Sequence, residues 1–459
     1  MPKRPIVLIH GYSDEGKSFA AWRNVLQTHG YPQDKIRVCS YATLTNEVTI
    51  KDIAEGFERA LRIQTGLRGD EEFDAIVHST GMLVIRTWLA SYAKRRSRLK
   101  HLIGLAPGNF GSPLAHKGQS WLGAIFKGNK NWQGPDFLEA GVEVLDALEL
   151  GSSFTWNLAH RDLIGKHTYF GPDADTPYVF TFCGAKGLTG MSALANEPGM
   201  DGTVRWAGCA LNTRKITIDL TIPPGRENSA TQKKRFNFEK WCQQDIPLIP
   251  IKDNNHSTIM ESPSDDLVAM VVEALAVDNK KDFTEWLKRA KAKTQRLDLD
   301  QWQQFIIRVI DERGDPVPDY HLRLFTLLDK VKLIRPFDLD VHAYSRDSSL
   351  RCFHVNLSKI ELKKLKNLHL QVIAESGSDR VGYVGYGSEK LTAEDRSGDD
   401  GKWDAQIDIS PLLTDAAVKF FYPFTTTLIE IKLNREPLPP EPSTDPNRIC
   451  WFDSQELPG

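Results

Sequence analysis

The chain places a serine, an acid and a histidine in the order expected for nucleophilic chemistry on a parallel α/β sheet. Ser79 ends an apolar, β-like run (74–77) and is followed by Gly81 and a helix-like run. The start of such a helix offers free backbone N–H groups to a developing negative charge. A serine hydroxyl becomes a nucleophile when a histidine takes its proton and a carboxylate orients that histidine. We therefore predict Ser79 as nucleophile, His256 as general base and Asp201 as orienting acid.

The acid is less constrained than the other two residues. Asp201 follows the strand-like run 178–183, and His256 follows the apolar run 246–251. Loops at the carboxyl ends of parallel strands bring such distant residues together. An aspartate before glycine is also common in turns. Three other carboxylates therefore stay open as the acid: Asp173, Asp175 and Glu197.

The transition state also needs backbone donors for its oxyanion. His10-Gly11-Tyr12 follows the first apolar run, 6–9, and the N–H of Tyr12 is predicted to pair with the N–H of Thr80. Four neighbouring residues are predicted to shape the site without acting as bases: His10, Gly11, His78 and Gly81. The six cysteines are scattered without CxxC pairs, so neither a metal nor another cofactor is expected.

Alternating strands and helices in the first half of the chain predict a mostly parallel sheet with right-handed crossovers. Apolar runs predict strands at 6–9, 35–41, 74–77, 101–105, 178–183, 215–221 and 246–251. Apolar residues at helical spacing predict helices at 20–28, at 49–64, from Ser79 to about Lys94, and at 264–277. The polar segment 223–240 is interpreted as a surface insertion. Together these elements define a catalytic domain over 1–277.

Residues 116–172 interrupt that alternation with an aromatic, apolar segment that includes Trp121, Trp132 and Trp156. Two interpretations stay open: a helical cap with its own core, or a lid that forms an acyl-binding wall over Ser79.

The pattern changes after residue 277. Charged residues predict a helical linker at 278–300. Six strand-like runs separated by Gly, Pro, Asp and Ser turns then predict a β-sandwich-like domain over 301–435: 305–311, 320–328, 339–343, 351–357, 368–375 and 427–433. The role of this domain stays open, with binding of a partner protein as one interpretation. The proline-rich residues 436–459 are predicted to form an extended tail.

Composition limits the function classes. The formal net charge of −2 over 459 residues gives no nucleic-acid signal. No apolar run approaches the roughly 20 residues of a membrane helix. No secretory signal precedes the first strand, which predicts a cytoplasmic protein and leaves signal-independent export open.

These motifs resemble those of the α/β-hydrolase superfamily, in its lipase-like branch, over about residues 5–277. The resemblance implies a minimal α/β-hydrolase fold that begins at the third strand of the full sheet. It also implies the triad and the oxyanion donors that were predicted above from the residues themselves. Valine at 77 and methionine at 82 depart from the family pattern, which favours glycine at both positions. The matching pieces are Ile9-His10-Gly11, His78-Ser79-Thr80-Gly81, Asp201-Gly202-Thr203-Val204 and Asn255-His256-Ser257.

The predicted function is a serine hydrolase that cleaves carboxylic esters of lipids or other hydrophobic acyl groups through an acyl-enzyme. Its expected partners are an ester or lipid substrate and, transiently, a membrane surface. Three alternatives stay open: a bacterial phospholipase effector, an acyltransferase using the same triad, and a non-enzymatic binding protein on a hydrolase scaffold.

Overall fold

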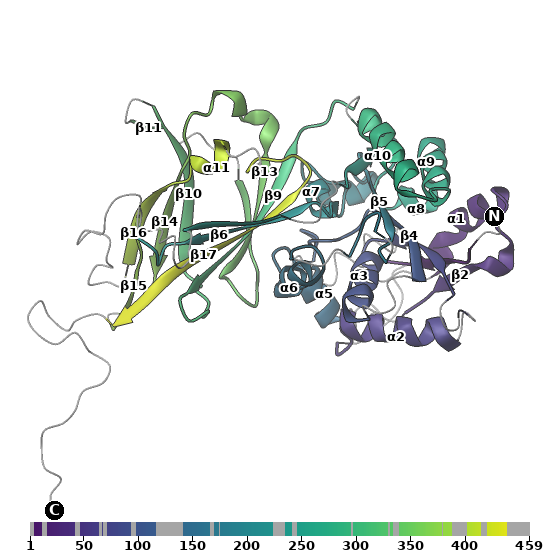
Figure 1. Cartoon of the computed structure of the whole chain (residues 1–459), viewed down its shortest axis with the longest axis horizontal. Helices are drawn as coiled ribbons and strands as arrows, with labels where there is room; N and C mark the ends of the chain where they lie inside the picture. The colour runs from purple at the N-terminus through teal and green to yellow at the C-terminus, as the bar shows by residue number, and fades with distance from the viewer. Residues whose placement is uncertain are drawn as a thin grey trace, which may run out of the picture.

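The protein comprises an α/β unit joined to a β unit (Figure 1). This computed structural model describes residues 4–11, 16–41, 46–63, 67, 71–92, 98–115, 141–165, 169–173, 175–223, 235–240, 246–294, 297–328, 331–333, 339–378, 380–387, 402–414 and 420–437. Residues 116–140, which hold most of the aromatic segment, and the tail from 438 lie outside this range.

The first sheet has six parallel strands in the order β2-β1-β3-β4-β5-β8. Their bounds are β1 Ile6–Ile9, β2 Ile36–Cys39, β3 Phe73–His78, β4 Leu99–Leu105, β5 Tyr178–Gly184 and β8 Leu248–Ile251. Both faces of this sheet are covered, which explains why β1 and β3 are buried at every position and read as continuous apolar runs. The α/β-hydrolase fold predicted from the motifs is confirmed.

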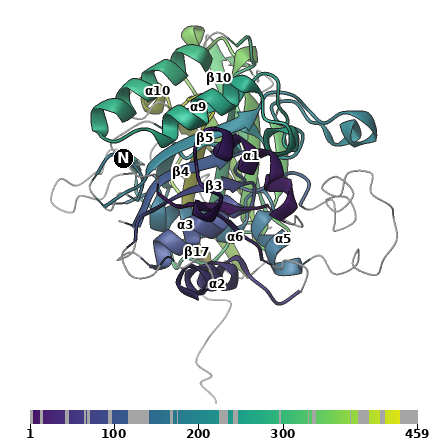
Figure 2. The same cartoon turned by 90° about the vertical axis from the view of Figure 1, so that its right-hand side faces the viewer.

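Helices cover the two faces of the sheet (Figure 2). One face packs on α1 Ala20–Thr28, α8 Thr258–Glu261, α9 Asp265–Leu275 and α10 Lys280–Thr294. The opposite face packs on α2 Ile50–Ile63, α3 Gly81–Ser91, α5 Val142–Leu148 and α6 Ser153–Asp162. Short 3-10 helices lie at Gly16–Phe19, Gln33–Lys35, Gly190–Ala195, Leu357–Lys359 and Leu362–Lys364.

The predicted linker helix packs on the hydrolase core. The apolar side of α10 buries Phe283 and Trp286 among the helix α9 and strand β5 residues. The Trp286 ring lies 4.5 Å from the Phe180 ring, in an edge-to-face arrangement. The helix therefore extends the α/β unit beyond residue 277 and is more than a solvated connector.

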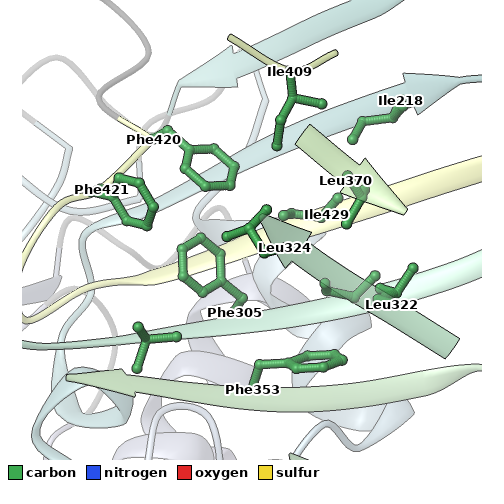
Figure 3. Close-up of a pocket in the computed structure, with 12 residues that line it drawn as sticks. Ile218, Phe305, Leu322, Leu324, Phe353, Leu370, Ile409, Phe420, Phe421 and Ile429 are labelled. Carbon is green, nitrogen blue, oxygen red and sulfur yellow. The ribbon is translucent and has the colours of Figure 1, made fainter. Parts of the chain in front are cut away.

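The β unit is a sandwich of two sheets. The larger sheet follows the order β12-β13-β9-β17-β6-β7, with β15 paired to β17, and the smaller follows β11-β10-β14-β16. Their inner faces share one apolar core, and an apolar cavity lies between them, lined by residues such as Phe305, Leu322 and Leu370 (Figure 3). The bounds are β6 Thr213–Asp219, β7 Phe236–Lys240, β9 Trp302–Asp311, β10 Tyr320–Leu328, β11 Val331–Leu333, β12 Leu339–Ala343, β13 Leu350–Asn356, β14 His369–Glu375, β15 Val381–Val384, β16 Lys402–Asp408 and β17 Thr426–Pro437, with two short helices at α7 Trp206–Cys209 and α11 Pro411–Thr414.

One predicted strand belongs to a different sheet than expected. The run 215–221 was expected in the parallel hydrolase sheet, but β6 pairs with β17 and β7 in the β unit. The expected surface insertion 223–240 likewise contains β7. The physical reason is visible in β6, where buried Ile216 and Ile218 alternate with half-buried polar residues. Such alternation is typical of a strand buried mainly on one face. The domain division at 277 stays a prediction. Two strands that precede it, β6 and β7, belong to the larger sheet of the β unit.

Within the predicted cap, α5 and α6 pack on the core around α3, and Trp156 is buried there. Trp121 and Trp132 lie outside the described residues, so the lid stays a prediction. Among the described residues, no helix is both long and apolar enough to cross a bilayer.

A buried ion pair joins α3 to α6. Arg86 donates from Nε to Asp162 at 2.8 Å and from Nη2 at 2.9 Å, and both side chains are fully buried. Arg86 also donates from Nη1 to the carbonyl oxygen of Asn109 at 3.0 Å. Burial raises the pKa of Asp162, while the Arg86 charge opposes that shift.

We predict that Asp162→Ala lowers the free energy of unfolding by about 3–5 kcal/mol, because it leaves the Arg86 charge buried and unpaired. Denaturant titration measures the loss. The matched control is Glu273→Ala, which breaks the exposed pair with Arg289 and should cost less than about 1 kcal/mol. Equal losses in the two variants would contradict the prediction.

Candidate active site

Ser79 occupies a strained turn between β3 and α3. Its φ is +50°, a left-handed conformation that non-glycine residues rarely adopt. Three backbone hydrogen bonds hold it: Ser79 N–H donates to the Leu105 carbonyl at 3.1 Å, and the Ser79 carbonyl accepts from Met82 N–H at 3.1 Å and Gly108 N–H at 3.3 Å. Strain of this kind costs about 1–3 kcal/mol and persists where the surroundings enforce it, typically at active sites.

Gly81 allows the first turn of α3 to approach β1. A Cβ at this position would lie 2.7 Å from the Ile9 carbonyl oxygen and 2.8 Å from that of His10. Both distances are shorter than any ordinary carbon–oxygen contact, so the close crossing of helix and strand requires glycine here. The crossing places the Gly11 backbone beside Ser79, because a Cβ at Gly11 would lie 3.0 Å from the Ser79 Cβ.

Asp201 and His256 are hydrogen-bonded to each other although 55 residues separate them. His256 Nδ1 donates to Asp201 Oδ2 at 3.0 Å, and His256 N–H donates to the Asp201 carbonyl oxygen at 3.0 Å. Both side chains are fully buried. The bond to Nδ1 leaves Nε2 as the ring nitrogen that can exchange a proton with a nucleophile.

Both oxygens of the Asp201 carboxylate accept hydrogen bonds. Its Oδ1 accepts hydrogen bonds from the Thr203 N–H at 3.0 Å and the Val204 N–H at 2.8 Å, which leaves Oδ2 for His256. Gly202 makes this tight turn with φ of +100°, and a Cβ there would lie 2.5 Å from the Leu188 Cγ. The turn therefore explains Asp201 by its carboxylate and Gly202 by its backbone, while residues 203 and 204 contribute their backbone amides.

The alternative acids lie elsewhere. Glu197 is paired with Arg205 at 3.3 Å. Asp173 and Asp175 are exposed in a turn before β5. Of these carboxylates, Asp201 is the one that accepts a hydrogen bond from the His256 ring.

His78 links the strand that precedes Ser79 to His256. Its Nε2 donates to the His256 carbonyl oxygen at 3.0 Å, and the two imidazole rings lie 4.8 Å apart. Burial and the neighbouring His256 hold the pKa of His78 well below its usual value of 6.5. His78 is therefore neutral, and because Nε2 carries the hydrogen, Nδ1 is unprotonated.

His10 fixes the loop after β1. Its Nε2 accepts from the Tyr41 N–H at 3.2 Å, so its Nδ1 carries the hydrogen and donates to the Gly11 carbonyl at 2.7 Å. The Tyr41 ring stacks on the imidazole at 4.3 Å. Tyr12 lies outside the described residues, so its oxyanion role stays a prediction. Thr80 precedes α3, where the first amide groups of a helix lack intrahelical acceptors.

The loop after β4 connects the two halves of the site and was not predicted from the sequence. Ala106, at its start, has φ of +46°. Gly108 N–H binds the Ser79 carbonyl, and Ser112 Oγ donates to the Thr203 carbonyl at 2.6 Å. The Pro107-Gly108 pair indicates a turn at this loop. It gives no information on the contacts of the loop with Ser79 and Thr203, which lie far away in the sequence. No group of three His, Cys, Asp or Glu side chains among the described residues is arranged to hold a metal ion.

We predict that Gly81→Ala destabilises the protein by about 1–3 kcal/mol and lowers ester turnover, because the new Cβ forces α3 away from β1. The control is Gly56→Ala in α2, where a Cβ meets nothing within 4 Å. That change should stabilise the protein by about 0.5–1 kcal/mol through helix propensity. Thermal unfolding and turnover of an activated ester measure both. An active, stable Gly81→Ala variant would contradict the close crossing.

We also predict a loss of stability in mild acid that His78 explains in part. Below about pH 6.5 an unfolded histidine binds a proton, whereas folded His78 stays neutral. The free energy of unfolding therefore decreases as the pH is lowered, by up to about 1.4 kcal/mol per pH unit for this group. Denaturant titrations between about pH 7.5 and about pH 5.5 should show a shallower fall in His78→Asn. Parallel pH profiles would contradict the assignment.

No protein-family model and no curated protein matches the chain. Among solved structures, phospholipase PlaB from Legionella pneumophila matches with a TM-score of 0.76 at 22% identity, over 95% of this chain and 94% of that chain. A structure of the same phospholipase in complex with thio-NAD gives the same values. The match extends over both units, and identity this low shows the fold. The chain therefore combines an α/β-hydrolase fold with a β-sandwich, as the sequence predicted.

Proposed function

We propose that the protein is a serine hydrolase that cleaves carboxylic esters of lipids or other hydrophobic acyl groups. The observation that carries the proposal is the buried hydrogen bond from His256 to Asp201, which His78 links to the strained Ser79 turn. A serine, an imidazole and a carboxylate in this chain order are the parts required for acyl transfer.

In the proposed reaction, Ser79 Oγ attacks the ester carbonyl carbon while His256 Nε2 takes its proton. Asp201 holds the imidazole by Nδ1 and stabilises its protonated form. The oxyanion is bound by the Thr80 N–H and, by prediction, the Tyr12 N–H, where loss of one donor typically costs about 10²–10³ in turnover. His256 then gives its proton to the leaving alcohol. Water, activated by the same histidine, attacks the acyl-enzyme and releases the carboxylic acid.

A phospholipid substrate is the finer form of this proposal. Its support is the shared fold with a protein named a phospholipase, over nearly all of both chains. The aromatic segment 121–156 adds a sequence-based reason to expect an apolar acyl chain, since lids and acyl-binding walls are apolar.

We predict that Ser79→Ala lowers hydrolysis of p-nitrophenyl esters by at least about 10⁴-fold and abolishes labelling by a fluorophosphonate. The control is Ser91→Ala, at the exposed end of the same helix, which should leave turnover unchanged. Fatty-acid release from phosphatidylcholine vesicles tests the finer form. Transfer of the acyl group to an added alcohol, in place of hydrolysis, would identify an acyltransferase. Full turnover by Ser79→Ala would refute the proposed nucleophile.

A further inference from the structure

The segment that carries Asp201 runs between the two units. It leaves the first sheet at Gly184, the end of β5, and enters the larger sheet of the β unit at Thr213, the start of β6. There, β6 pairs in parallel with β17. His256, in contrast, follows β8 of the first sheet. The relative position of acid and base is therefore set by the direct contacts between His256 and Asp201 and by how the segment is anchored in each unit.

Residues 199–206 form a tight hairpin around the acid. Trp206 N–H donates to the Gly199 carbonyl at 2.9 Å, and Asp201 N–H donates to the Val204 carbonyl at 3.1 Å. The two amide bonds to Asp201 Oδ1 lie within the same hairpin. Because these bonds are all local, the hairpin moves as one piece, and a contact that holds Gly199 also holds Asp201.

Trp302 makes that contact from the β unit. It is the first residue of β9, and a Cβ at Gly199 would lie 2.6 Å from its indole Cγ and Cδ2. The indole is 8% exposed and stacks on the His354 ring at 4.3 Å. Its carbonyl accepts the Phe424 N–H at 2.7 Å. Trp302 shares an apolar cluster with residues of β5, β8 and the connecting segment: Cys183, Val204, Trp206, Cys209, Ala210 and Leu248.

Further contacts join the β unit to the same segment. Thr426 Oγ1, from β17, donates to the Ala207 carbonyl at 3.0 Å. Arg205 Nη1 lies 3.9 Å from the Cys352 Sγ of β13. The short helix α7 contacts β5 and β8 on one side and β9 on the other, and Figure 1 shows it at the junction of the units.

We propose that Trp302 is a positioning residue for Asp201, so that the β-sandwich is a structural part of the catalytic site. The inference rests on the proposed triad. The indole sets where the hairpin sits, the hairpin sets the Asp201 carboxylate, and the carboxylate sets the His256 ring. Thr426 holds the next turn of the same segment from the neighbouring strand. In this arrangement the β unit supports catalysis by positioning Asp201, and this role does not require a partner protein.

The test compares Trp302→Ala with Trp403→Ala. Trp403 is a fully buried tryptophan of β16 in the same unit, packed against Gly385 and away from the acid hairpin. Turnover of a p-nitrophenyl ester is measured per active site titrated with a fluorophosphonate. Trp302→Ala should lower kcat about 10- to 100-fold with KM unchanged, because Asp201 does not touch substrate. Trp302→Phe keeps a ring against Gly199 and should retain most of kcat, and Trp403→Ala should retain nearly all of it.

The same variants are then made in an Asp201→Ala background. Because Trp302 acts through Asp201, Trp302→Ala should cause no further loss of kcat there. A full additional loss, or an equal loss in Trp403→Ala, would overturn the positioning role. Normal turnover by Asp201→Ala alone would instead refute the proposed triad. If Asp201→Ala is inactive while Trp302→Ala keeps wild-type kcat, the triad stands and the positioning role fails.

If Trp302→Ala does not fold, Thr426→Val carries the test. Valine keeps the shape of threonine and removes the hydrogen bond to the Ala207 carbonyl. We expect a loss of kcat of about 3- to 10-fold, as for one neutral hydrogen bond, and no loss in the Asp201→Ala background. An unchanged kcat, or the same loss in both backgrounds, would overturn the inference.

Discussion

The hydrogen bond from His256 to Asp201 is the constraint that the surrounding structure serves. Both side chains are fully buried, and an ionised carboxylate away from water costs several kcal/mol unless its oxygens are satisfied. Asp201 meets this requirement with two backbone amides and the imidazole. That solution demands a tight hairpin, a glycine at 202, and a fixed distance between the hairpin and the loop after β8. The bond from the His256 N–H to the Asp201 carbonyl fixes that distance directly, and Trp302 of the β unit packs against the hairpin at Gly199.

Backbone strain is concentrated at the opposite side of the site. Ser79 and Ala106 both have positive φ values, and they end the neighbouring strands β3 and β4. Each is held by a hydrogen bond to the next strand along, from Ser79 N–H to the Leu105 carbonyl and from Ala106 N–H to the Phe182 carbonyl. The sheet edge thus acts as a rigid frame that enforces two unfavourable turns, and α3 begins directly after the first of them.

Local patterns in the sequence were sufficient for the elements with strong periodicity. The helices at 20–28 and 49–64 and the strands at 6–9 and 74–77 were predicted to within about a residue, since their burial is set by one repeating pattern. The strand β16 was missed although its exposure alternates at every position. The contact of Trp302 with Gly199 was beyond local reasoning, because it joins residues 103 positions apart through packing that no spacing rule describes.

The departures from the hydrolase motif also have a physical explanation in the neighbouring strand. Valine at 77 fills space that the motif keeps clear with glycine, and Met82 follows on α3. Val77 pairs with Gly104 of β4, so the adjacent position on the same face of the sheet has no side chain. A Cβ at Gly104 would lie 3.6 Å from the Met82 Cε, which places the methionine over that glycine. Val77 and Met82 therefore pack beside a position of β4 that has no side chain, whereas the glycine that the close crossing of helix and strand requires is Gly81.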